Sequence, residues 1–273
     1  MKTILFPTDF SENANHAMLF ALQLTKDFDA RLHVLNTYQI PYASSVPNVN
    51  NLLEALKKNA IDDLNNCVNN IKSNSKYKNL NITHEAISGD LINVIDDIET
   101  ALNVDLIVLG TKGATGIKEV LIGSNAQQVV YHSKSSVLVI PEQASAFSFN
   151  NIALASDLTP VEEKKFNTFV SLCKKYHAKI TVVSVESANT DKENESLNNH
   201  QLTEILSGLE HQFHMIKNDD ITNGINSFVE ENRSNILALI SKKYSFFENI
   251  FHKSITNKLA CHTKIPIFVI KEK

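Results

Sequence analysis

The sequence predicts an α/β protein made of two similar halves, each an open parallel sheet of five strands flanked by helices. Three observations lead to this prediction. Short apolar segments alternate with longer segments whose apolar residues recur at helical spacing. The second half of the chain repeats the first. Glycine, which is scarce elsewhere, is concentrated directly after one of the predicted strands.

The first half alternates strands and helices along its length. Ser11 is placed to accept backbone hydrogens at the start of a helix, and later helices carry apolar stripes over residues 52–71 and 91–102 and from Ser124 onward. One strand, 106–109, is apolar at every position, as expected when helices cover both faces. The predicted strands of this half are 4–6, 31–37, 82–87, 106–109 and 137–140.

The repeat has two registers. Near the start of each half, matching residues are 148 positions apart (4 to 152), and toward the end they are 130 apart (109 to 239). We therefore predict two domains, 1–143 and 149–273, joined by a polar linker at about 142–150. Matching pairs include Ile4 and Ile152, Asp9 and Asp157, Leu24 and Leu172, Leu109 and Leu239, and Ser124 and Ser254.

The composition narrows the class of protein. The 273 residues carry a formal net charge of −4, which argues against a nucleic-acid or membrane-surface binder, because both need a basic face. No apolar run approaches the roughly 18 residues that span a bilayer. Three widely separated cysteines fit neither a disulfide framework nor a zinc site. We expect a cytoplasmic protein that contacts neither membrane nor nucleic acid.

A glycine-rich loop follows the apolar strand 106–109. Four of the seven glycines are Gly110, Gly113, Gly116 and Gly123, and Ser124 then begins a helix. Ligands of open α/β sheets bind at the carboxyl ends of strands, and a helix N-terminus there offers free N–H groups to phosphate. Glycines let the backbone approach an anion closely. The loop therefore predicts a phosphate site, although glycines that only shape a long connection are the alternative.

Other phosphate-binding motifs are absent from the sequence. It contains no G-x-x-x-x-G-K-[ST] and no G-x-G-x-x-G after the first strand, so neither a P-loop nor a dinucleotide site is supported. Thr8 and Asp9, at the end of the first strand, are expected on the same rim as the glycines. The Asp9 carboxylate could there hold ribose hydroxyls, or a phosphate-bound Mg²⁺ through water.

The glycine spacing resembles a known signature. Gly110-x-x-Gly113, nine residues and Gly123-Ser124 resemble the G-2x-G-9x-G-[ST] pattern of ATP-binding universal stress proteins, and Pro7-Thr8-Asp9 resembles that family's opening motif. The resemblance covers the whole chain as a tandem pair. It implies the adenine nucleotide alpha hydrolase-like fold with strand order 3-2-1-4-5. It also implies intrachain pairing of the two domains through their fifth strands, and ATP or AMP in the first-half cleft.

The resemblance also assigns site residues by position. The adenosine side would be lined by the first-strand end, adenine would meet the backbone of Thr37, and the glycine loop and the following helix would surround ribose and phosphates. Lys112 is placed for phosphate charge. The full set implied is Pro7, Thr8, Asp9, Thr37, Gly110, Lys112, Gly113, Gly123, Ser124 and Asn125.

The second half departs from this signature. At the matching positions the four glycines are replaced by Ile240, Lys243, Phe246 and Lys253. Side chains then occupy the space where phosphates would approach the backbone. We expect the second half not to bind ATP in the family's manner.

The favoured function is a binding module, an ATP-binding stress-response regulator. The alternative is a slow ATPase or an autophosphorylating protein, and a tandem that binds no nucleotide is a third possibility. No catalytic residue is assigned, because no dedicated base is apparent. No metal ligand is assigned either, because His211 and His214 are spaced to lie on opposite faces of a strand. Association into a homodimer stays open.

Overall fold

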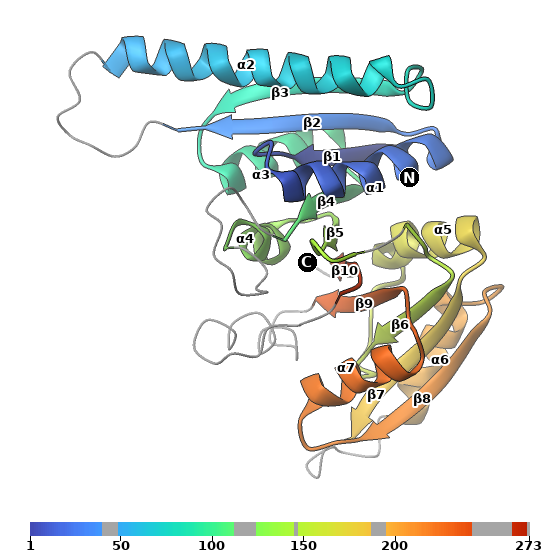
Figure 1. Ribbon diagram of the computed structural model, residues 1–273. Helices are drawn as coiled ribbons and strands as arrows, with labels where there is room; N and C mark the ends of the chain where they lie inside the picture. The colour runs from blue at the N-terminus through green and yellow to red at the C-terminus, as the bar shows by residue number, and fades with distance from the viewer. Residues whose placement is uncertain (40–48, 112–123, 145–146, 187–194, 242–263, 272–273) are drawn as a thin grey trace. The chain divides into compact units, whose positions relative to one another are not determined.

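The computed structural model describes residues 1–39, 49–111, 124–144, 147–186, 195–241 and 264–271. Mostly parallel strands alternate with helices, which confirms the predicted α/β class (Figure 1). The described chain forms two compact units: unit 1 extends to Ser135 and unit 2 begins at Ser136.

In its described residues, unit 1 has four parallel strands in the order β3-β2-β1-β4, as the predicted order requires. Helix α1 packs on β1, β2 and β4, and the long helix α2 lies along β2 and β3 (Figure 1). Right-handed crossovers place α1 and α2 on one face of the sheet and α3 and α4 on the other. The elements are β1 (Thr3–Pro7), α1 (Glu12–Phe28), β2 (Arg31–Tyr38), α2 (Val49–Ser73), β3 (Asn81–Ser88), α3 (Leu91–Leu102), β4 (Leu106–Gly110) and α4 (Ser124–His132).

Over its described residues, unit 2 has six strands in the order β5-β10-β9-β6-β7-β8. The neighbours from β10 to β8 are parallel and follow the predicted 3-2-1-4-5 pattern, whereas β5 pairs with β10 antiparallel, with Leu138 opposite Phe268. The elements are β5 (Ser136–Ile140), β6 (Asn151–Ala155), the 3₁₀ helix η1 (Glu163–Phe166), α5 (Asn167–Tyr176), β7 (Lys179–Glu186), α6 (Glu195–Ile205), β8 (His211–Lys217), α7 (Ile221–Glu231), β9 (Ile236–Ser241) and β10 (Ile267–Lys271).

Local capping explains why the helices of unit 1 begin where the sequence predicts. The Ser11 hydroxyl accepts the backbone N–H of Ala14 at 3.2 Å, so it caps α1. Asp90 caps α3 by accepting the backbone N–H groups of Ile92 and Asn93. These acceptors satisfy N–H groups that have no partner within their own helix.

Left-handed residues recur at matching places in the two halves. A non-glycine residue with positive φ is uncommon, yet such residues occur in pairs separated by 148 or 130 positions. This recurrence supports a shared backbone path. The pairs are Phe10 (60°) with Leu158 (54°), Asp29 (49°) with His177 (50°), and Asn103 (48°) with Arg233 (50°).

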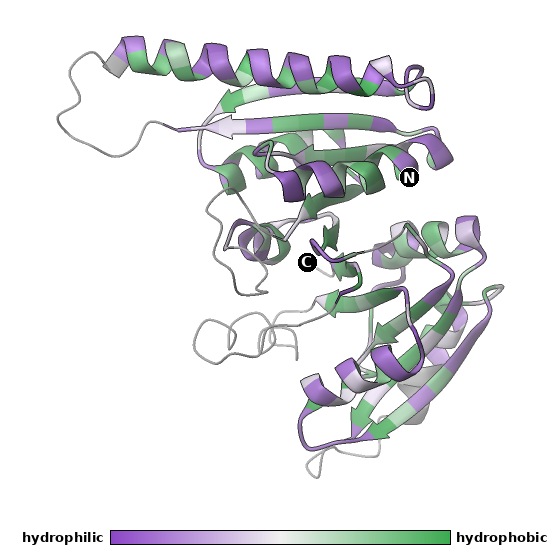
Figure 2. Ribbon diagram, in the orientation of Figure 1, coloured by the Kyte–Doolittle hydropathy of each residue, from purple (hydrophilic) through white to green (hydrophobic). Residues whose placement is uncertain are grey.

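The strands carry the apolar core, and the helices turn polar faces outward (Figure 2). Two aromatic residues of the predicted polar linker pack against unit 2. Phe149 is 1% exposed and stacks on Tyr176 with ring centroids 5.2 Å apart, while Phe147 meets the same ring at 5.5 Å. This part of the linker therefore packs on α5 within unit 2. Among the described helices, none combines the length and apolar character needed to cross a bilayer.

Candidate functional site

A cleft of about 200 Å³ opens at the carboxyl ends of the unit 1 strands. Its described lining comes from the ends of β1, β2 and β4, the first turn of α1 and the starts of α3 and α4. The structure thus brings together the predicted site residues Pro7, Thr8, Asp9, Thr37, Gly110, Ser124 and Asn125. The other three, Lys112, Gly113 and Gly123, lie outside the described residues.

The turn after β1 is held by its own side chains. Thr8 is 8% exposed; its backbone N–H donates to the carbonyl of Leu35 at 2.8 Å, and its hydroxyl accepts the N–H of Phe10 at 3.0 Å. Asp9 accepts the N–H of Ser11 at 3.1 Å and is exposed on the rim. The Thr8 side chain therefore shapes the turn, and the Asp9 carboxylate is the group presented to the cleft opening.

Asn36 also lines the cleft, although sequence reasoning did not single it out. Its side-chain N–H₂ group donates to the carbonyl of Thr8 at 2.8 Å, which ties the end of β2 to the end of β1. The sequence signal that could have identified Asn36 is its position next to Thr37, where β2 reaches the rim. Because this bond joins two strand ends, it holds in place the part of the cleft lined by the residues predicted to bind the nucleoside.

Gly110 is required by packing as well as by any ligand. A Cβ atom at this position would lie 2.8 Å from Nδ2 of Asn13 and 3.0 Å from the carbonyl oxygen of Asn13. The first turn of α1 therefore approaches β4 as closely as only glycine permits. For Gly110, close packing alone explains the glycine, whether or not a ligand binds there.

Unit 2 is built differently at the matching place. Ile240 replaces Gly110 and is 3% exposed. Where α1 begins at Glu12, the matching residue is Pro160, and η1 begins only at Glu163. The residue that matches Asn13 is Val161, whose backbone N–H and carbonyl bond the side chain of Gln201 at 3.0 and 2.6 Å. The larger side chain of Ile240 is accommodated because the helix of unit 2 begins later in the sequence. In the described part of unit 2, no helix start therefore approaches Ile240 as closely as the start of α1 approaches Gly110.

The turn that carries Asp9 is nevertheless preserved in unit 2. The Ser156 hydroxyl accepts the N–H of Leu158 at 3.0 Å, and Asp157 accepts the N–H of Thr159 at 3.1 Å. These are the counterparts of the Thr8 and Asp9 contacts, with the same distances. The opening motif is thus retained in both halves as a turn, and the described differences at this rim are Ile240 in place of Gly110 and the later start of the helix.

The described lining of the cleft carries one acidic side chain, that of Asp9. Over the residues with described positions, no group of three or more His, Cys, Asp or Glu could hold a metal ion. Mg²⁺ bound with a nucleotide commonly uses only one or two carboxylates together with phosphate oxygens and water. The donor set therefore fits a hydrated Mg²⁺ brought by phosphates, held at Asp9.

One buried titratable group lies elsewhere in the unit 1 sheet. His33 on β2 is 6% exposed, and its Nδ1 lies 2.9 Å from the hydroxyl of Thr83. Burial lowers the pKa of the His33 imidazole below its ordinary value, with nearby Arg31 and His84 acting in the same direction and Glu85 opposing them. The ring is therefore neutral near pH 7 and belongs to the packed sheet.

Comparison with known proteins identifies the family. The sequence profile of the universal stress protein family matches residues 1–141, more than half of the 273-residue chain. The chain belongs to the universal stress protein family. Two universal stress proteins of Methanocaldococcus jannaschii support this membership. One is 27% identical over 139 residues, covering 51% of this chain and 81% of the relative; the other is 29% identical over 158 residues, covering 53% and 97%.

The fold of the whole chain also has a precedent among universal stress proteins. A crystal structure of a universal stress protein from Archaeoglobus fulgidus superposes with a TM-score of 0.73 and 20% identity, covering 99% of this chain and 96% of that one. At this identity the likeness concerns the fold. It shows that an α/β chain of this length and arrangement exists within the family.

Proposed function

We propose that this universal stress protein binds an adenine nucleotide, ATP or AMP, in the unit 1 cleft and acts as a nucleotide-dependent stress-response regulator. The observation that carries the proposal is the convergence of seven of the ten predicted site residues on one cleft. These residues come from four segments that are distant in sequence. The described ends of the glycine signature, Gly110 and Ser124, therefore lie beside the opening motif, which supports a nucleotide site at this rim.

The cleft divides naturally into two sides. The ends of β1 and β2, joined by the bond from Asn36 to Thr8, would hold the nucleoside. The first turn of α4, with Ser124 and Asn125, offers N–H groups that have no partner within the helix and would meet phosphates. A space of about 200 Å³ is below the roughly 300–1,000 Å³ of common ligand sites. We therefore assign the nucleoside to the cleft and the outer phosphates to its open side, with Lys112, Gly113 and Gly123. Mg²⁺ would accompany ATP and be held by Asp9 through water.

We propose that the chain is a tandem of two universal stress domains, 1–143 and 149–273, in the cytoplasm. The repeated left-handed residues and the matching turns at Asp9 and Asp157 support the tandem. The antiparallel pairing of β5 with β10 supports association through the fifth strands. The two described cysteines, Cys67 and Cys173, are free thiols, as a reducing compartment favours.

A substitution borrowed from the second half tests the ligand assignment. Gly113→Lys places the residue found at the matching position 243 into the glycine signature. We expect isothermal titration calorimetry to show loss of ATP binding, because a long side chain would occupy the phosphate approach. Gly116→Lys is the matched control, since Gly116 lies in the same loop but outside the signature. Equal affinity of Gly113→Lys and the unchanged protein would contradict the proposal.

A hydrolysis assay on the same purified protein distinguishes a nucleotide-binding regulator from an ATPase. With γ-labelled ATP, we expect phosphate release far slower than the roughly 1 s⁻¹ at the lower end of common enzymes. Turnover above that rate would show that hydrolysis is the main activity.

A further inference from the structure

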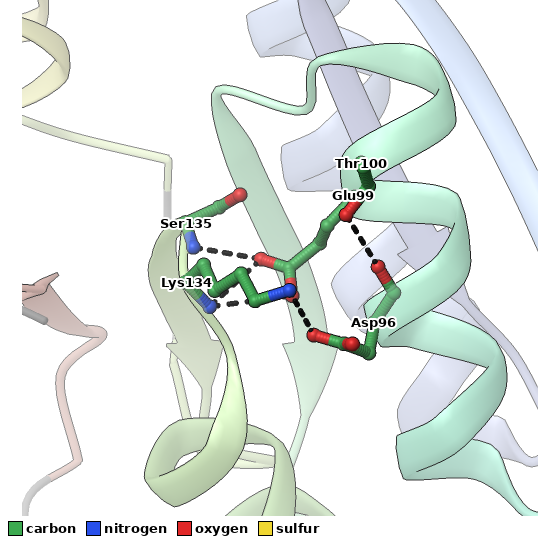
Figure 3. A network of polar contacts seen from close by, with 5 residues as sticks. All are labelled: Asp96, Glu99, Thr100, Lys134 and Ser135. Carbon is green, nitrogen blue, oxygen red and sulfur yellow. Dashed lines mark hydrogen bonds and ion pairs between the residues drawn. The ribbon is translucent and has the colours of Figure 1, made fainter.

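A buried carboxylate connects α3 to the segment that follows α4. Glu99 is 5% exposed, and its two carboxylate oxygens accept the backbone N–H of Lys134 at 3.1 and 3.2 Å and that of Ser135 at 2.7 Å (Figure 3). A buried carboxylate is unfavourable unless donors satisfy it, and hydrogen bonds to an ionised acceptor are stronger than neutral ones. We call Glu99 with these two amides the Glu99 clamp.

The clamp is distinct from the ion pair beside it. The Lys134 ammonium group points to Asp96, one turn earlier on α3, and both of these side chains are exposed (Figure 3). Exposed ion pairs contribute little to stability. Ser135 is further fixed by its hydroxyl, which donates to the carbonyl of Val104 at 2.8 Å. The buried clamp and the exposed pair can therefore be removed separately.

The clamp holds the end of α4 that lies opposite the cleft. Ser124 and Asn125, at the N-terminus of α4, line the cleft, and so does Leu91 at the start of α3. The clamp sits beyond the C-terminus of α4, and α3 packs against α4. The nine residues of α4 span about 13 Å at the usual rise. A tilt of about 5° about the clamp would move the helix start by about 1 Å, which is enough to misplace a binding group.

The second half offers an internal comparison. The position that matches Glu99, 130 residues later, is Val229, which is 6% exposed. The same half has lost the glycine signature, with Ile240 and Lys243 at two of its positions. The buried carboxylate and the glycine signature thus occur together in one half and are both replaced in the other.

We propose that Glu99 is a positioning residue for the phosphate side of the nucleotide site. By anchoring the segment after α4, it aims the N–H groups of the first turn of α4 at the phosphates. The inference rests on the proposed nucleotide binding. Its effect falls on phosphates alone, because the nucleoside side is formed by the ends of β1 and β2, which the clamp does not touch.

The experiment compares ATP with adenosine. Ligand-observed NMR titration, which also detects millimolar affinities, measures both ligands on the unchanged protein and on Glu99→Val, the residue of the second half. We expect Glu99→Val to lower the affinity for ATP about tenfold or more, because phosphate contacts are lost, and to change the affinity for adenosine by less than about twofold. Glu99→Gln keeps one acceptor oxygen and should retain most of the ATP affinity. Asp96→Asn, which removes only the exposed ion pair with Lys134, should leave the affinity for both ligands unchanged.

Each outcome decides a different claim. If the unchanged protein binds adenosine and ATP but Glu99→Val weakens both by the same factor, or neither, the positioning role is wrong while the proposed function stands. If the unchanged protein does not bind ATP, the proposed function fails, and this inference fails with it. Thermal melting reports whether each variant is folded. Should Glu99→Val not fold, Glu99→Gln provides the test, with a smaller loss of ATP affinity expected and unchanged adenosine affinity.

Discussion

At the scale of residues, packing and ligand binding make separate demands on the cleft. Gly110 is fixed by the close approach of Asn13, which would exist with no ligand present. Thr8 is occupied by the turn after β1, whereas Asp9 is exposed beside it. Asn36 joins the two strand ends. A substitution in this site can therefore change stability, binding or both, and each of these effects has to be measured.

Gly110→Ala tests the close approach. The new Cβ would meet the Asn13 backbone at 3.0 Å, so the strand end and the helix must separate. We expect the free energy of unfolding to fall by about 1–3 kcal/mol, in the range of other overpacked sites. Urea denaturation measures this change. The neighbouring Thr111→Ala, which removes only a 3.5 Å contact with Asn13, should have a much smaller effect, and equal effects would contradict the explanation.

His33 predicts a pH dependence of stability. Because burial holds the pKa of the folded state below that of the unfolded state, the unfolded chain binds the extra proton first. The stability contribution is therefore fully present above about pH 6.5 and is lost as pH falls from there through the folded-state pKa. Denaturation midpoints between pH 7.5 and 5 should fall less steeply for His33→Gln than for the unchanged protein.

At the scale of elements, α3 and α4 both begin at the cleft and are joined at their other ends by Glu99. In the proposed site, these two helices would form the wall on the phosphate side, and the ends of β1 and β2 would form the nucleoside side. Their N-termini are held by different means: Asp90 caps α3, whereas α4 follows the glycine loop.

The caps of two matching helices provide a paired test. Asp90 caps α3 and Asp220, 130 residues later, caps α7 of unit 2 by accepting the N–H of Asn223 at 3.1 Å. We expect each Asp→Ala substitution to lower stability by about 1 kcal/mol. Only Asp90→Ala should also lower the affinity for ATP, because α3 begins at the cleft. Calorimetry that showed equal ATP affinities for the two variants would contradict the assignment of the site to unit 1.

Local signals predicted the elements well, and long-range contacts set the limit of prediction. The start of α3 was predicted from the apolar stripe that begins at Leu91, and the structure shows Asp90 capping the helix there. The roles of Asn36, Glu99 and Phe149 were missed, because each depends on a partner that is distant in sequence: Thr8, Ser135 and Tyr176. The delayed start of α5 was also not predicted, since it reflects contacts of Val161 with Gln201, 40 residues away. Seven of the predicted residues line one cleft, and they could be selected from the sequence because a glycine signature and a strand end are local patterns.

At the scale of the whole molecule, one fold occurs in two versions within a chain. Both units keep the turn at the end of the first strand of their sheet, with the same hydrogen bonds. Unit 1 keeps Gly110 and the buried Glu99, and unit 2 has Ile240 and Val229 in their places. Under the proposed function, ligand binding therefore belongs to unit 1, and unit 2 completes the tandem.

The stoichiometry of nucleotide binding tests this asymmetry most directly. Native mass spectrometry of the intact chain, titrated with ATP to millimolar concentration and checked by calorimetry, counts the nucleotides that each chain holds. We expect saturation at one ATP per chain, and loss of this binding in Gly113→Lys. Saturation at two per chain, or no bound nucleotide at all, would contradict it.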